Sequence, residues 1–175
     1  MKTTFAALIA LGLSTSAALA HVTLAVPEAP QGKSYKAVLG VGHGCEGKTT
    51  RKVRVQIPEG VISVKPMPKA GWTIDIVKGP YEKPYDYYGS KLTEGVKEIS
   101  WTGELPDAYF DEFAFRGYLT DSLPVGETVF FPVVQECDGD AAERWIEIPA
   151  KGQDAHDMES PAAGLKILPP VPAAH

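Results

Sequence analysis

The sequence predicts an all-β protein, an antiparallel β-sandwich of about seven to nine strands. Apolar and polar residues alternate in short stretches, most clearly over 52–57 and 71–77, which is typical of strands with one buried face. Turns rich in glycine and proline, such as Pro58-Glu59-Gly60, separate these stretches at spacings of about 8 to 12 residues. After residue 20, no stretch long enough for a helix of average length has helical periodicity. Short strands at this spacing favour two packed sheets.

The expected strands follow the chain in order. Each is a run with alternating, β-branched or aromatic residues that ends at a glycine or proline turn. The strands are expected at 21–26, 34–42, 49–57, 61–66, 71–77, 96–102, 110–119, 127–137 and 144–149. The last two are predicted to form a hairpin around Asp138-Gly139-Asp140, a typical turn sequence.

Two segments lack a clear strand pattern. The tyrosine-rich segment 80–89 is predicted to be a surface loop, because its periodicity is weak. Residues 151–175, rich in alanine and proline, are predicted to be a tail in which 165–168 is a candidate docked edge strand. The single folded domain is therefore predicted to span 21–150.

The first 20 residues have the features of a secretory signal peptide. Lys2 precedes an apolar run over 5–13, which is too short to cross a bilayer. Ala18 and Ala20 form an A-x-A pattern that predicts cleavage between Ala20 and His21. The mature protein is therefore expected to begin at His21 and to be periplasmic.

Cleavage at this position creates a metal-binding group. The new α-amine, with a pKa of about 7.7 to 8.0, and the Nδ1 of His21 can chelate one ion, because both nitrogens lose their protons readily near neutral pH. Histidines inside the chain have no free α-amine. The alternative is that a histidine follows the cleavage site by chance.

Charge and hydropathy exclude two classes of partner. The full chain has a net charge of −5, and loss of Lys2 lowers this to −6, so nucleic-acid binding is not expected. The mature sequence contains no long apolar run and no polybasic segment, so it is not expected to span a membrane.

Cys45 and Cys137 are the two cysteines of the chain. Two thiols in an exported protein usually pair, and this pair would close a loop of 93 residues. In the chain-entropy model such a loop contributes roughly 4 to 5 kcal/mol to stability. The alternative, a copper–thiolate site, has no C-x-x-C spacing in its favour.

The disulfide would bring further polar residues together. It would join the segment that contains His43 and Glu46 to the end of the strand before Trp145. The nitrogens of His21 and a carboxylate oxygen from Glu46 suit the tetragonal geometry that Cu(II) prefers, and Trp145 could shield the metal. Each residue also has a structural alternative. Glu46 could be a solvated glutamate in a turn, His43 a loop histidine without a metal role, and Trp145 a core aromatic residue.

Four sequence features resemble the YcnI-like domain family of bacterial exported copper-binding proteins. They are His21-Val22-Thr23, Pro58-Glu59-Gly60-Val61, Gly71-Trp72 and Trp145-x-Glu147-x-Pro149. The resemblance covers about residues 22–149 and implies a sandwich of the immunoglobulin or cupredoxin-like type with a Cu(II) site called a monohistidine brace. The resemblance implies that His21 provides the amine and imidazole nitrogens of this copper site and that Glu46 provides its oxygen. It also implies that Trp145 is the tryptophan that lies against the metal. His43, beside Glu46, is either a fourth ligand or a hydrogen-bond partner of the carboxylate.

The favoured hypothesis is a periplasmic Cu²⁺-binding protein of copper homeostasis that catalyses no reaction. It would sequester copper or deliver it to periplasmic or membrane copper-handling proteins. Two alternatives stay open. A copper-dependent polysaccharide oxygenase would need a second histidine, for which His43 is the candidate. A metal-free interaction domain would bind through the tyrosine-rich segment 81–88.

Overall fold

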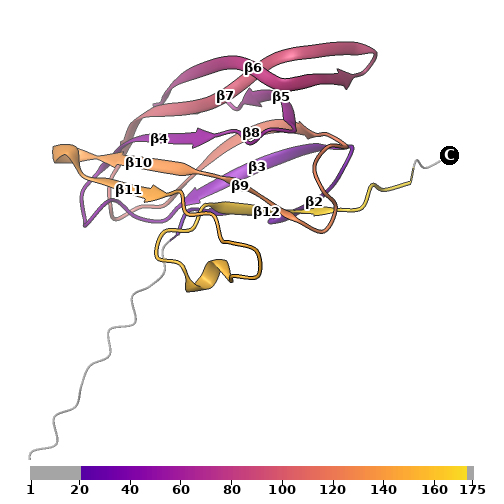
Figure 1. Ribbon diagram of the computed structural model, residues 1–175. Coiled ribbons are helices and arrows are strands. Elements are labelled where there is room, and N and C mark those ends of the chain that lie inside the picture. Colours follow the sequence, from indigo (N-terminus) through magenta and orange to yellow (C-terminus); the bar gives the residue numbers. More distant parts are fainter. Residues whose placement is uncertain (1–20, 173–175) are drawn as a thin grey trace, which may run out of the picture.

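The structure is a computed structural model that describes residues 21–172, the side chain of His156 excepted. Within this part it contains twelve strands and two 3₁₀ turns, η1 (Asp138–Asp140) and η2 (Ala155–Asp157) (Figure 1). The strands are β1 (Thr23–Leu24), β2 (Glu28–Pro30), β3 (Ser34–Val41), β4 (Thr50–Gln56), β5 (Val61–Pro66), β6 (Thr73–Tyr87), β7 (Ser90–Leu105), β8 (Asp111–Leu119), β9 (Thr128–Phe131), β10 (Val133–Cys137), β11 (Ala142–Trp145) and β12 (Ala163–Leu168). The predicted signal peptide, residues 1–20, lies outside the described residues.

The strands form three hydrogen-bonded sheets. Their orders are β1-β3-β8-β5, β11-β10-β4-β7-β6 and β2-β12-β9. The pairings between named strands are antiparallel, apart from the parallel pair β12–β2. The all-β antiparallel sandwich is therefore confirmed. The strand number exceeds the expected seven to nine because strands as short as β1 and β2 are too brief to show a periodicity in sequence.

The main core lies between the sheets. Its fully buried side chains include Leu39 and Phe113 of the first sheet, Trp101 of the second, and Leu165 and Ile167 of the third. Burial of each such side chain contributes about 1.5–3 kcal/mol. All three sheets thus share one core, and β12 lies between β2 and β9 rather than at the sheet edge that we expected for 165–168.

The prediction of a surface loop over 80–89 was wrong. This segment belongs to the long β6–β7 hairpin, which projects at the top of Figure 1. Tyr81 and Tyr85 are buried in a second small core with Ile62. A register shift between Pro80 and Tyr85 interrupts the pairing of β6 with β7, because proline cannot donate to the ladder. This irregularity hides the strand period.

One predicted strand is divided in two. The expected strand over 127–137 forms β9 and β10, which enter different sheets on either side of Pro132. Proline lacks the amide hydrogen that a continuous ladder requires. The second half keeps its predicted role, because β10 forms a hairpin with β11 around η1.

Candidate metal centre

Strand β1 fixes the position of His21. It pairs with β3 so that Thr23 lies opposite Gly40 and Leu24 opposite Leu39, and His21 precedes this ladder by two residues. Val22 is 2 % exposed and packs into the main core. The predicted mature terminus is therefore anchored to the domain by β1 and by Val22.

The ring of His21 lies against the indole of Trp145. The ring centroids are 5.3 Å apart and the planes are tilted by 55°. Trp145 is the last residue of β11 and is buried. The structure thus brings together two of the sequence-predicted site residues that are 124 positions apart in the chain.

Two nitrogens at this contact lack hydrogen-bond partners. They are Nε2 of His21 and Nε1 of Trp145, and both atoms are buried. A buried polar atom without a partner costs about 1–3 kcal/mol. Such atoms are uncommon in folded proteins, and Trp101 Nε1 and the Tyr81 hydroxyl are further examples here.

A cavity of about 270 Å³ opens beside His21. Thr23 and Pro27 line one side, and Ala155 and Pro161 from the segment between β11 and β12 line another. The complete lining is His21, Val22, Thr23, Leu24, Pro27, Ala155, Pro161, Ala162, Ala163 and Gly164. Residues after 150, which we predicted to form a tail, therefore contribute to the surroundings of His21.

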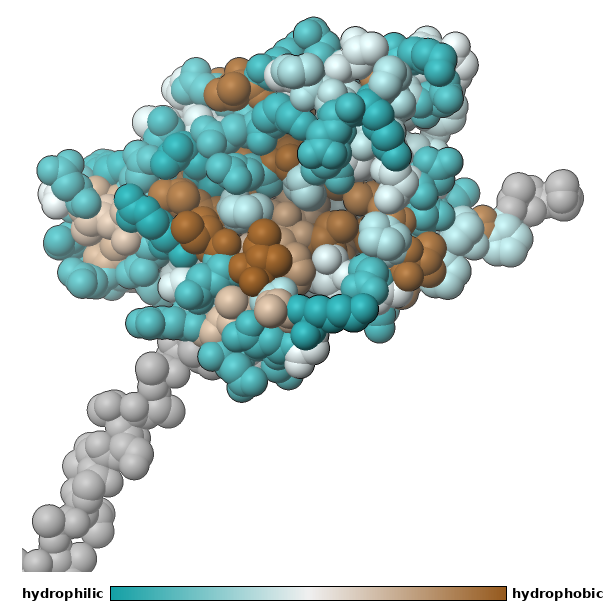
Figure 2. Space-filling model, viewed as in Figure 1, coloured by the Kyte–Doolittle hydropathy of each residue, from teal (hydrophilic) through white to brown (hydrophobic). Residues whose placement is uncertain are grey.

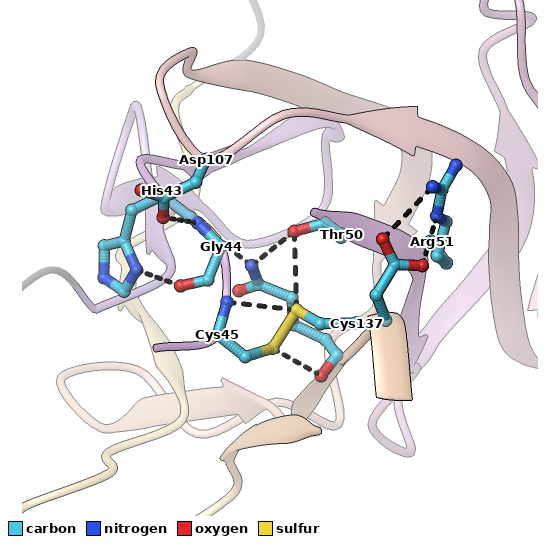
Figure 3. Close-up of a disulfide and its surroundings, with 9 residues drawn as sticks. His43, Gly44, Cys45, Thr50, Arg51, Asp107 and Cys137 are labelled. Carbon is cyan, nitrogen blue, oxygen red and sulfur yellow. Dashed lines mark hydrogen bonds and ion pairs between the residues drawn. A yellow bond between two sulfur atoms is a disulfide. The ribbon is translucent and has the colours of Figure 1, made fainter. Parts of the chain in front are cut away.

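The predicted disulfide between Cys45 and Cys137 is confirmed (Figure 3). The two Cα atoms are 5.9 Å apart, and both cysteines are buried. The main-chain N–H of Cys45 also donates to Sγ of Cys137 at 3.1 Å. The disulfide therefore ties the segment before Glu46 to the end of β10.

Sequence analysis missed Gln135, which holds the same segment. Its side chain is 1 % exposed. Its Nε2 donates to the main-chain oxygen of His43 at 2.6 Å and to Oγ1 of Thr50 at 2.7 Å. The signal was present in the sequence, because Gln135 occupies an inward position of β10 between Val133 and Cys137, where an apolar residue is expected.

Glu46 occupies a strained turn. The N–H of Lys48 donates to the carbonyl of Cys45 at 2.9 Å, and Glu46 and Gly47 have φ values of 50° and 79°. Two positive φ values in succession are typical of a type I′ turn, whose first central position favours asparagine, aspartate or glycine. A glutamate there costs about 1–2 kcal/mol, and its side chain is exposed. Local strain of this kind clusters at binding sites.

His43 is half-buried and its Nδ1–H donates to the carbonyl of Gly44 (Figure 3). The neighbouring N–H of Gly44 donates to Oδ1 of Asp107 at 2.9 Å. In the part of the chain that the structure describes, no three side chains of His, Cys, Asp or Glu gather as a metal-binding group. The structure brings His21 together with Trp145, whereas no hydrogen bond or ion pair among the described residues joins His21 to Glu46 or His43.

The protein is thus an immunoglobulin-like β-sandwich. The first residue of its domain, His21, packs against Trp145 at the end of β11. A crystal structure of an uncharacterized protein from Nocardia farcinica, described as having an immunoglobulin-like fold, has a TM-score of 0.61 and is 24% identical in sequence. The match covers 85% of this chain and 98% of that one. At this identity the similarity shows the fold.

The chain belongs to the YcnI-like family. The family described as a domain of unknown function (DUF1775) matches residues 21–167. This match begins at His21 and includes β12. A comparison with curated proteins found no match. Over the described residues, no helix has the length and apolar character that crossing a membrane requires.

Proposed function

We propose that this protein is exported to the periplasm, where its processed N-terminus binds Cu(II) for copper homeostasis, by sequestration or by delivery, without catalysing a reaction. The observation that carries this proposal is the position of His21. It is the first residue of the family match, it follows the predicted cleavage site, and its ring lies against the buried indole of Trp145.

The available donors suit Cu(II). After cleavage, the α-amine and Nδ1 of His21 form one chelate, and Glu46 is the proposed carboxylate donor. This set of nitrogen and oxygen atoms fits the tetragonal preference of Cu(II), which also binds such sites more strongly than the other divalent first-row metals. With Nδ1 on the metal, Nε2 is the ring nitrogen left beside Trp145, whose indole covers one side of the site.

A small donor set at a chain terminus favours exchange of the ion with a partner protein. Ile146 and Ile148, which follow Trp145, are 44% and 57% exposed. Figure 2 shows apolar surface on the face where β9, β11 and β12 lie. Exposed apolar residues of this kind are typical of surfaces that bind other proteins, which supports delivery over storage.

The oxygenase alternative is less well supported. It needs a second imidazole at the metal, and His43 is the only internal histidine that the sequence offered for this role. The Nδ1–H of His43 instead donates to the carbonyl of Gly44. We therefore propose His43 as a residue that shapes the segment before Glu46 rather than as part of a second brace.

Electron paramagnetic resonance of copper-loaded mature protein tests the proposal. We expect one Cu(II) per chain with nitrogen hyperfine coupling. His21→Ala should abolish this signal and Glu46→Gln should change it, whereas Glu28→Gln, an exposed carboxylate on β2, should leave it unchanged.

A second form of the protein separates the brace from ordinary histidine binding. Extra residues before His21 convert its α-amine into an amide, so this form should lose the signal. Equal binding by both forms would contradict the proposal. Mass spectrometry of the exported protein should find His21 as the first residue, and a different first residue would also contradict it.

A further inference from the structure

Three cations lie in one row across the outer face of the first sheet. Lys36 of β3 pairs directly with Arg116 of β8, and Arg116 pairs on its other side with Lys65 of β5. All three side chains are exposed, whereas the neighbouring side chains of Tyr35 and Phe115 are buried in the main core. Because adjacent strands are about 4.8 Å apart, the row spans about 10 Å.

This row has no counter-charge within the part of the chain that the structure describes. The ion pairs there involve other cations, namely Arg51, Arg54, Lys69, Lys91 and Lys97. Like charges directly opposite each other on neighbouring strands destabilise a sheet. The chain has a net charge of −5, so a general excess of basic residues does not explain three aligned cations. A bound anion removes the repulsion between them.

A cavity of about 240 Å³ opens at the Lys65 end of the row. It lies between β5 and the β6–β7 hairpin, which are neighbours at the top of Figure 1. Lys78 also lines this cavity and, like the row, forms no ion pair among the described residues, while Glu94 is the single carboxylate of the lining. Ligand pockets usually measure about 300–1,000 Å³, so this one admits only a small molecule.

The wall of this cavity has two unusual features. Tyr81 is 9% exposed, and its hydroxyl is buried without a hydrogen bond of normal geometry, although the main chain of Ser63 lies close to it. A Cβ at Gly95 would lie 1.7 Å from this hydroxyl oxygen, so only glycine leaves room for it. Ser63 has a φ of 51°, which is uncommon for a residue other than glycine. An unused donor and a strained backbone therefore lie beside the cations.

The side chains of the row suit an oxyanion. The guanidinium of Arg116 is a planar fork that can bind two oxygens of one phosphate or carboxylate. Lys36 and Lys65 add a point charge on either side of it. A phosphate monoester carries about 1.5 to 2 negative charges near pH 7, so it balances such a row better than a single carboxylate does.

The charge of the whole protein indicates a small ligand. Its net charge of −5 opposes the approach of nucleic acids and anionic membranes, which carry many negative charges. A small anion responds mainly to the local row, because exposed charges more than about 10 Å away are largely screened at 0.1 M salt. The size of the cavity agrees with this.

We propose that Lys36, Arg116 and Lys65 bind the phosphate group of a small phosphate ester. The organic part of the ligand lies in the cavity between β5 and the β6–β7 hairpin, where the hydroxyl of Tyr81 donates to it.

This site is separate from the candidate metal centre. Lys36 lies four residues along β3 from Gly40, the partner of Thr23, which is a distance of about 13 Å along the strand. The inference therefore does not depend on copper binding at His21, and either proposal can fail without the other.

Isothermal titration calorimetry of the metal-free mature protein, at constant ionic strength, tests the proposal with glycerol 3-phosphate and with inorganic phosphate. We expect one ligand per chain and tighter binding of the ester, because only the ester has a part that enters the cavity. Arg116→Gln should weaken the binding of both by about tenfold or more, since hydrogen bonds between charged groups are among the strongest in proteins. Arg116→Lys, which keeps the charge but not the fork, should have an intermediate affinity. Tyr81→Phe should remove the preference for the ester.

Lys166→Gln is the matched control. Lys166 is an exposed lysine of β12, in a different sheet, so its replacement should leave both affinities unchanged. Thermal melts without phosphate show whether Arg116→Gln folds. This variant should be at least as stable as the wild type, because it removes a repulsion between like charges.

Three results would overturn the proposal. The first is equal phosphate affinity in Arg116→Gln and the wild type. The second is equal affinity of the wild type for the ester and for inorganic phosphate, which would exclude a ligand body in the cavity. The third is binding of phosphatidylglycerol vesicles without binding of either small phosphate, which would make the partner a membrane.

Discussion

The side-chain amide of Gln135 holds the main-chain oxygen of His43 at 2.6 Å. This bond links the middle of β10 to the segment between β3 and Glu46. The disulfide joins β10 to the same segment two residues later, at Cys45. Two independent connections therefore fix the approach to Glu46, and one of them is a buried polar group that a purely apolar core would not contain. A segment held in this way changes little in position when an ion binds, which reduces the entropic cost of binding.

Replacement of Gln135 by leucine should destabilise the fold. The change leaves the oxygens of His43 and Thr50 without their donor inside the protein, and each buried unpaired group costs about 1–3 kcal/mol. Urea denaturation of the two proteins measures this loss. Gln56→Leu, on the exposed side of neighbouring β4, should change stability by less than about 0.5 kcal/mol. Equal stabilities for the two variants would show that the bond to His43 is dispensable.

Trp145 should report copper binding through its fluorescence. Cu(II) quenches a nearby excited indole, and Trp145 is the tryptophan in contact with His21. Trp145→Phe should therefore lose most of the quenching that Cu(II) causes in the wild type. Trp72→Phe should retain it, because Trp72 precedes β6, which lies at the opposite edge of the five-stranded sheet from β11. Titration of both variants with Cu(II), followed by tryptophan emission, measures the quenching in each. Equal quenching in the two variants would contradict the prediction.

Substitution of Gly44 should disrupt the segment before Glu46. A Cβ at this position would lie 1.7 Å from the main-chain oxygen of Lys48, so Gly44→Ala must displace the backbone and should cost about 1–3 kcal/mol. We also expect weaker copper binding. A Cβ at Gly42 meets no atom within 4 Å, which makes Gly42→Ala the control. Thermal melts measure the stability of both variants, and copper titrations measure their affinity. Equal results for Gly44→Ala and Gly42→Ala would contradict the predicted role of Gly44.

Glu59 should make stability depend on pH. Burial raises the pKa of Glu59, but hydrogen bonds from Lys97, Tyr85 and the N–H of Glu82 outweigh it and hold the pKa below its ordinary value of 4.5. The charged carboxylate is thus favoured in the folded state. Its contribution is complete above pH 4.5 and is lost as the pH falls through the lower pKa of the folded state.

Thermal melts across this pH range test the role of Glu59. At pH 7, Glu59→Gln should be less stable than the wild type by about 1 kcal/mol, and the difference should disappear in acid. Glu94→Gln removes an exposed carboxylate on the same hairpin and should show no such trend. A difference between Glu59→Gln and the wild type that is constant with pH would exclude the ion pair as its cause.

Several features of the site could be read from the chain. The pairing of Cys45 with Cys137 followed from cysteine number in a chain expected to be exported, and the hairpin that ends at Trp145 followed from its turn residues. Other features had weak local signals. The strand over 80–87 was missed because prolines interrupt its period, and Gln135 was missed because an inward polar residue has meaning only when its partners are known.

The amino-acid sequence by itself determined the β-sandwich class, the disulfide and the choice of His21 as the residue of interest, because alternation, turn chemistry and a cleavage pattern are local properties. Only the tertiary structure decided that the imidazole of His21 meets Trp145, that Gln135 reaches His43, and that Ala155 and Pro161 line the cavity beside His21. These contacts join residues that are distant in the chain, and their geometry depends on strand register and sheet packing, which no local pattern specifies.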